Sequence, residues 1–173
     1  DIKQKIYNEL NNVQSIFQFQ RWVHRDDYHI TLAFLGGADE GRLQTAIDLV
    51  TKAMTEEKSF PLQIVGLNIF GNNKAPRIFW GAVSEEERLY ELQATVHRKC
   101  LESGFTLESR PYHPHITIAR KWCAQEEFNP QILTKHNPFQ ERHLHFTVNE
   151  IVLYKTNIDK TPKYEPIVCC SLQ

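Results

Sequence analysis

A four-residue pattern occurs twice in this chain and constrains its fold more than any other feature. The copies are residues 29–32 and 115–118, and each reads histidine, isoleucine, threonine and a further aliphatic residue. Successive side chains of a β-strand point to opposite faces. The histidine and threonine of each copy would therefore share one face, and the two aliphatic residues would share the other. Two such strands side by side would offer two imidazoles and two hydroxyls to one small anion.

Two histidines in one site suit acid–base chemistry on a phosphate. The unperturbed pKa of histidine is about 6.5, so near neutral pH one imidazole can accept a proton while another donates one. Threonine hydroxyls can donate hydrogen bonds to phosphoryl oxygens. We therefore predict that His29 and His115 are catalytic and that Thr31 and Thr117 bind phosphate. The alternative is two ordinary strand histidines with satisfied hydrogen bonds, which suits a single copy better than a pair.

Arg120 is a candidate phosphate ligand at the end of the second motif. Its offset from His115 and Thr117 is odd, so on a regular strand it would face away from them. A bulge or turn at the strand end would re-aim it. We predict that its guanidinium binds phosphate oxygens, since the two groups match in geometry. The alternative is a surface arginine.

Substrate contacts beyond the phosphate are less sharply indicated. Residues that could stack on a base or contact a ribose are Arg77, Tyr112, Phe34 and Trp80. Each of these is more often a core or rim residue. His113 is a further possible substrate contact, and it is expected either to support the site or to be exposed.

Two histidine pairs raise the alternative of a metal site. His113 and His115, and likewise His143 and His145, are spaced so that both imidazoles could lie on one strand face. No cysteine lies close to either pair in the sequence, and the one acidic residue close by is Glu141, two positions before His143. We therefore predict no metal, and a metal-dependent hydrolase remains an alternative.

Size and composition are those of one globular domain, or of two small lobes that share a core. The chain has 173 residues, of which 41% are hydrophobic and 24% charged. No apolar run approaches the roughly 18–20 residues of a membrane span, and residues 1–4 read as helix rather than as a signal peptide. The four cysteines form no C-x-x-C pair, which favours reduced thiols. We expect a cytoplasmic protein, and a monomer because no apolar stripe is left over.

The charge distribution favours a compact anionic ligand. A net charge of −1 does not indicate a protein that binds nucleic acid over its whole surface. Basic residues nevertheless gather at the motifs: Arg21 and Arg25 precede the first, and Arg110, Arg120 and Lys121 surround the second. A small positive site on a neutral body suits one phosphate better than a long duplex.

Apolar periodicity predicts an α+β fold. Helical spacing predicts helices at residues 2–17, at 39–54, at 84–102 after a Ser84/Glu87 capping box, and briefly at 130–135. Apolar and alternating runs predict strands at residues 21–23, 28–35, 60–70, 77–83, 115–119, 144–148, 151–154 and 164–171. Consecutive strands without a helix between them favour antiparallel sheets. Because the motif recurs, we expect a bilobal fold: two pseudo-twofold-related sheet lobes with outer helices and a central cleft.

Four blocks of the chain together resemble the two-histidine phosphoesterase superfamily. They are residues 29–36 (His-Ile-Thr-Leu-Ala-Phe-Leu-Gly), 76–80 (Pro-Arg-Ile-Phe-Trp), 110–120 (Arg-Pro-Tyr-His-Pro-His-Ile-Thr-Ile-Ala-Arg) and 151–156 (Ile-Val-Leu-Tyr-Lys-Thr). More narrowly, they resemble the bacterial and archaeal RNA 2′,3′-cyclic phosphodiesterases, also called 2′-5′ RNA ligases. The resemblance covers nearly the whole chain.

This resemblance implies one bilobal domain over residues 1–173 and a metal-free mechanism without a cofactor. It implies catalysis by His29 and His115, and phosphate binding by Thr31, Thr117 and Arg120. Members of the group usually begin with a strand before the first helix, whereas this chain begins at the helix. We therefore expect that strand to be missing.

The resemblance also implies an activity. We expect hydrolysis of an RNA-terminal 2′,3′-cyclic phosphate to a 2′-phosphate, with His115 as base and His29 as acid, and with 2′-5′ RNA ligation as the reverse reaction. The partners would be RNA ends or cyclic nucleotides, and no membrane. Two further alternatives stay open: a non-catalytic module that binds RNA ends or nucleotides, and a phosphodiesterase for other cyclic phosphodiesters, such as cyclic ADP-ribose phosphates.

Overall fold

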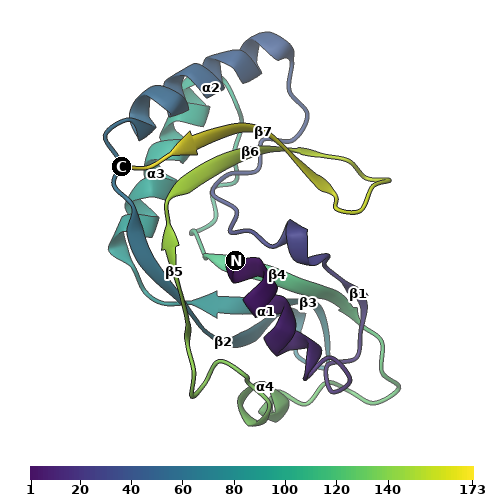
Figure 1. Cartoon of the computed structure of the whole chain (residues 1–173). Coiled ribbons are helices and arrows are strands. Elements are labelled where there is room, and N and C mark those ends of the chain that lie inside the picture. Colours follow the sequence, from purple (N-terminus) through teal and green to yellow (C-terminus); the bar gives the residue numbers. More distant parts are fainter.

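The elements of the computed structural model, which describes residues 1–173, form two antiparallel sheets and the helices around them (Figure 1). The helices are α1 (Ile2–Asn11), the short 3-10 helix η1 (Arg25–Asp27), α2 (Glu40–Met54), α3 (Glu87–Glu102) and α4 (Gln131–Lys135). The strands are β1 (Phe19–Trp22), β2 (Phe60–Asn72), β3 (Ala75–Val83), β4 (His115–Trp122), β5 (Leu144–Val148), β6 (Glu150–Thr156) and β7 (Tyr164–Ser171). The larger sheet has the order β1-β4-β3-β2-β5, and β6 pairs with β7. The predicted α+β class with antiparallel sheets is confirmed; the sheets have five strands and two.

Two apolar clusters hold these elements together. The first lies between α1 and the larger sheet, where Ile6 and Leu10, one helical turn apart, pack with Phe79 and Ile118. The second joins α2, α3 and the start of β2, and its members include Met54, Phe60, Leu62, Leu89, Leu92 and Val96. In Figure 1, α2 and α3 lie on the side of the β6–β7 hairpin, and α1 crosses the larger sheet. No helix in the structure combines the length and apolar character that a membrane crossing requires.

Two predictions of helix ends are wrong. The first helix ends at Asn11 rather than at Phe17, because the chain turns so that Phe17 stacks on Phe79 in the core, with ring centroids 4.6 Å apart. Ser84 does not cap α3: its hydroxyl accepts the backbone N–H of Gln63 at 3.1 Å, and Glu86 caps the helix instead. In both places a tertiary contact overrides a local preference.

The prediction of a strand at residues 28–35 is also wrong. After η1 the chain runs extended, but only Ile30 makes a β-bridge, to Ile116 of β4. Neither β6 nor β7 pairs with this segment, since each pairs only with the other. A regular strand needs a continuous hydrogen-bonded neighbour, which β4 provides at one residue only.

Candidate active site

The second motif begins β4 and is oriented by the core. Ile116 and Ile118 are buried, with exposures of 4% and 1%. Alternation along the strand therefore turns His115 and Thr117 to the opposite face. Thr117 lies across from Trp80 of β3 on that face.

The first motif is brought beside the second by the bridge between Ile30 and Ile116. Residues that flank such an antiparallel bridge face one another, so His29 lies beside Thr117 and Thr31 beside His115. Cβ atoms of directly opposed residues are roughly 5 Å apart and those of diagonal residues roughly 7–8 Å apart, which makes the two histidines diagonal neighbours. The structure thus assembles on one small patch the four residues that the repeated pattern singled out.

Both imidazoles are held by the same local hydrogen bond. The Nδ1–H of His29 donates to the backbone carbonyl of Asp27 at 2.7 Å, and that of His115 donates to the carbonyl of His113 at 2.7 Å. A carbonyl oxygen can only accept, so Nδ1 carries the proton in each ring. The Nε2 atom of each ring is then a free acceptor when the ring is neutral, and a donor when it is charged.

The environment lowers the pKa of both histidines below the ordinary value. Burial is the largest cause in each case, because it disfavours the charged imidazolium. For His29, the charges of Lys3 and His115 lower the pKa further, whereas the carbonyl hydrogen bond and the Asp27 carboxylate raise it. The free site therefore favours two neutral imidazoles, and a bound anion would favour a proton on one of them.

Arg120 lies on the same face as His115 and Thr117 because of a bulge. The pairing of β3 with β4 passes from Phe79 opposite Ala119 to Trp80 opposite Thr117, which leaves one extra residue in β4. The bulge predicted from the odd offset is present. Its charge also lowers the pKa of His115, so the guanidinium lies close enough to act on the same patch.

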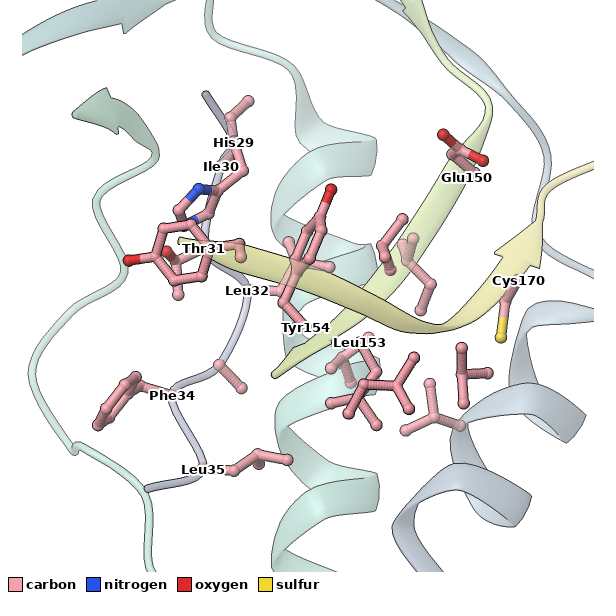
Figure 2. Close-up of a pocket in the computed structure, with 18 of the residues that line it drawn as sticks. His29, Ile30, Thr31, Leu32, Phe34, Leu35, Glu150, Leu153, Tyr154 and Cys170 are labelled. Atoms are coloured by element: carbon pink, nitrogen blue, oxygen red, sulfur yellow. The ribbon is translucent and has the colours of Figure 1, made fainter. Parts of the chain in front are cut away.

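The two threonine hydroxyls are uncommitted. Thr31 is exposed and Thr117 is half-buried, and neither side chain has a hydrogen-bond partner within the protein. A cavity of about 1010 Å³ opens beside the first motif. Figure 2 shows His29, Thr31 and Tyr154 on one part of its wall and the apolar Leu35 and Leu153 on another. The lining of this cavity includes His29 and Thr31 but not His115, Thr117 or Arg120, so the cavity borders the four-residue patch only on the side of the first motif.

Aromatic rings pack against each histidine. Tyr164 lies edge-on to His29 with ring centroids 4.7 Å apart, and Tyr154 is tilted against it at 6.1 Å. On the other side, the ring of Phe70 lies edge-on to His115 at 5.1 Å. The sequence analysis did not identify Tyr164, which comes late in the chain. Tyr154 belongs to the family-like block at residues 151–156, and that block was the signal that could have identified it.

Asp27 was missed as well, although it is the one buried charged residue, with 6% exposure. Its carboxylate accepts the backbone N–H of Lys163 at 2.9 and 2.8 Å and the backbone N–H of Tyr164 at 3.0 Å. These bonds tie the β6–β7 hairpin to the segment that carries His29. Figure 1 shows the hairpin, in yellow, reaching toward η1.

The other candidate substrate contacts do not all lie at the patch. His113 is exposed beside His115, with its ring edge-on to Trp80 at 5.0 Å. Tyr112 instead packs edge-on against Tyr90 of α3 at 5.8 Å, and its buried hydroxyl has no partner. Arg77 is exposed near the β2–β3 turn and makes no ion pair. The structure therefore brings His113 to the patch and assigns Tyr112 to packing.

The second histidine pair lies far from β4 in the sheet. The Nδ1 atom of His143 lies 3.1 Å from Oε1 of Gln63, and His145 is exposed on β5. No three His, Cys, Asp or Glu side chains are arranged so that they could hold a metal ion.

A comparison with known protein families identifies the superfamily of this chain. The model of the 2′-5′ RNA ligase superfamily matches residues 4–160. The chain therefore belongs to the 2′-5′ RNA ligase superfamily.

Two similar proteins are both named RNA 2′,3′-cyclic phosphodiesterase. The chain is 43% identical over 172 residues to an RNA 2′,3′-cyclic phosphodiesterase of Geobacillus stearothermophilus, covering 99% of this chain and 54% of that protein. It is 33% identical over 166 residues to an RNA 2′,3′-cyclic phosphodiesterase of Bacillus subtilis (strain 168), covering 96% and 87%. The chain thus spans about half the length of the first of these relatives and most of the second.

Solved structures show the same fold. E. coli LigT complexed with 3′-AMP superposes with a TM-score of 0.73 at 21% identity, over 97% of this chain and 91% of that chain. The protein TT0787 of Thermus thermophilus superposes with a TM-score of 0.76 at 20% identity, over 99% and 91%.

Proposed function

We propose that this protein hydrolyses a 2′,3′-cyclic phosphate at the end of an RNA and leaves a 2′-phosphate. One observation carries the proposal: the bridge between Ile30 and Ile116 sets two imidazoles diagonally across one patch, each with Nε2 free. Family membership supports it, as do the two relatives named RNA 2′,3′-cyclic phosphodiesterase.

In the proposed reaction, Nε2 of one neutral histidine takes a proton from water as the water oxygen attacks phosphorus. The bond from phosphorus to the 3′ oxygen breaks, and Nε2–H of the other, charged histidine donates a proton to that oxygen. The ring opens, and the phosphate stays on the 2′ oxygen. Hydroxyls of Thr31 and Thr117, with the guanidinium of Arg120, stabilise the charge on the other phosphoryl oxygens.

We assign His29 as the acid and His115 as the base, and the Asp27 carboxylate next to His29 supports this choice. Burial is the largest cause that lowers the pKa of His29, and the charge of Lys3 lowers it further; the carbonyl hydrogen bond and the carboxylate of Asp27 oppose both, whereas no carboxylate raises the pKa of His115. Burial is the largest cause that lowers the pKa of His115, and the charges of His113 and Arg120 lower it further. After turnover the base is protonated and the acid is neutral. Proton exchange with solvent then restores the starting protonation states of both histidines.

The decisive experiment measures cleavage of an RNA oligonucleotide that ends in a 2′,3′-cyclic phosphate. Because each acid or base role is worth about 10²- to 10⁴-fold, His29→Ala and His115→Ala should each lower kcat by at least about 100-fold. His145→Ala, which removes an exposed histidine on β5, is the matched control and should keep full activity. EDTA should not inhibit, and kcat/KM should depend on pH in a bell shape.

Near wild-type turnover by either single variant would refute the assignment of roles. Tight binding of a 2′-phosphorylated nucleotide by a wild-type protein that does not turn over would instead indicate a binding module. Loss of activity in chelator, restored by zinc, would indicate a metal-dependent hydrolase.

We further propose that the same residues run 2′-5′ ligation with another nucleophile, a reaction that is reversible. The 5′ hydroxyl of a second RNA then takes the place of water, and the 2′,3′-cyclic phosphate is opened to a 2′-5′ linkage. Incubation of paired RNA halves at high concentration tests this activity.

We also propose a cytoplasmic monomer: every residue of the patch comes from one chain, and all four cysteines are free.

A further inference from the structure

We propose that Arg21, beside Arg120, forms a second anion subsite that binds the phosphodiester on the 5′ side of the terminal nucleotide. The subsite would make the enzyme prefer RNA ends to cyclic mononucleotides. This inference rests on the proposed function and names its substrate class.

The register of the sheet places Arg21 on the catalytic face. Arg21 of β1 lies directly across from Arg120 of β4, and directly opposed residues point to the same side. The next residue, Trp22, lies across from Ala119 and turns into the core, edge-on to Phe79 at 6.1 Å. Phe19, two residues before Arg21, also lies in the core, so alternation along β1 does not by itself place Arg21. Its placement rests on its own exposure and on its position across from the exposed Arg120, which follows Thr117 on β4.

Neither guanidinium is neutralised within the protein. Arg21 and Arg120 are exposed, and neither forms an ion pair, although carboxylates pair with Arg25, Arg42, Arg88, Arg98 and Arg110. Like charges directly opposed across two strands are destabilising. An anion between or beside the two side chains would remove that repulsion, which is what a phosphate-binding position provides.

The order of residues across the sheet matches a chain that leaves the reactive end. Arg120 lies between Thr117, along β4, and Arg21, on the neighbouring strand. Because β1 is the edge strand, nothing in the sheet lies beyond Arg21 to obstruct an RNA. Arg120 is thus placed for the reacting phosphate, and Arg21 for a phosphate farther out.

Two substrates separate this role from catalysis: a 2′,3′-cyclic mononucleotide, which has no second phosphate, and a short RNA that ends in the same cyclic nucleotide. Arg21→Gln should lower kcat/KM for the RNA about tenfold and leave kcat/KM for the mononucleotide unchanged. The slope of log(kcat/KM) against log[salt] for the RNA should become shallower by about 0.7, the value of one lost phosphate contact on a single strand. Arg21→Lys, which keeps the charge, should recover part of the loss.

Arg142→Gln is the matched control. Arg142 is also exposed and without an ion pair, but it precedes β5 at the opposite edge of the sheet. It should change neither substrate nor salt slope. If Arg21→Gln lowered kcat/KM equally for the RNA and for the mononucleotide, the subsite would be refuted, because Arg21 would then act on the reacting phosphate. Wild-type kcat/KM for both substrates would refute it as well.

A binding measurement keeps this test separate from the proposed function. Fluorescence anisotropy with a 2′-phosphorylated RNA requires no turnover, and Arg21→Gln should weaken its binding about tenfold while binding of a 2′-phosphorylated mononucleotide stays the same. If the wild-type protein bound this RNA but hydrolysed no cyclic phosphate, the proposed function would fail while the subsite stood. Equal RNA affinity of wild type and Arg21→Gln would overturn the subsite.

Discussion

The structure makes a strong prediction for Asp27→Ala. The backbone N–H groups of Lys163 and Tyr164 lose the carboxylate that accepts their hydrogen bonds. These hydrogen bonds also hold Tyr164 in contact with the ring of His29. A hydrogen bond to a charged group contributes about 1.5–3 kcal/mol, so two donors correspond to about 3–6 kcal/mol. Part of this is offset because the buried carboxylate no longer has to be desolvated. We expect the free energy of unfolding to fall by about 2–4 kcal/mol.

The same change should move the titration of His29 in a direction that identifies the cause. Burial is the largest influence that lowers the pKa of His29, and the Asp27 carboxylate raises it by a lesser influence. If the hairpin detaches in Asp27→Ala, water reaches the ring and its pKa should rise. In Asp27→Asn one oxygen can still accept the N–H groups, so the hairpin stays in place, only the charge is lost, and the pKa should fall.

Urea denaturation and an NMR pH titration of the His29 Cε1–H resonance measure these two effects. Asp159→Ala, in the same hairpin and exposed, is the control and should leave stability and titration unchanged. If Asp27→Ala unfolds at the same urea concentration as wild type, with an unshifted His29 resonance, then the three hydrogen bonds do not hold the hairpin to the site.

Two further predictions concern the patch itself. Because both histidines have a pKa lowered on folding, the unfolded chain binds more protons between the folded values and about 6.5, so the free energy of unfolding should rise with pH through that window. Urea titrations at several pH values should show this rise, and His29→Gln should flatten it; an equally steep rise in His29→Gln would contradict the shift. Loss of a hydrogen-bond donor that stabilises the charge developing in the transition state typically lowers kcat about 10²- to 10³-fold. Thr117→Val should therefore lower kcat by about the same factor. Thr117→Ser should keep most of the activity, and a serine variant as inactive as the valine variant would show that the hydroxyl is not the functional group.

Much of the site could be predicted because its signal is local. Alternation within the second motif decides that Ile116 is buried and that His115 is not, and the odd offset of Arg120 required the bulge that the register contains. The rest depends on contacts between distant segments. Asp26 and Asp27 look alike in the sequence, yet one is exposed and the other is buried. The difference arises from the hairpin at residues 157–163, whose backbone donors reach one carboxylate and not the other.

The first motif shows how catalytic geometry can survive without the expected strand. His115 lies on a regular strand and His29 on an extended segment with a single bridge, yet each ring donates Nδ1–H to the carbonyl two residues earlier at the same distance of 2.7 Å. The tautomer and the free Nε2 therefore follow from the local chain in both copies. What differs is the set of charged neighbours: Asp27 and Lys3 act on His29, and His113 and Arg120 act on His115. A repeated sequence can thus supply two equivalent imidazoles, and in the proposed mechanism their different surroundings would distinguish the acid from the base.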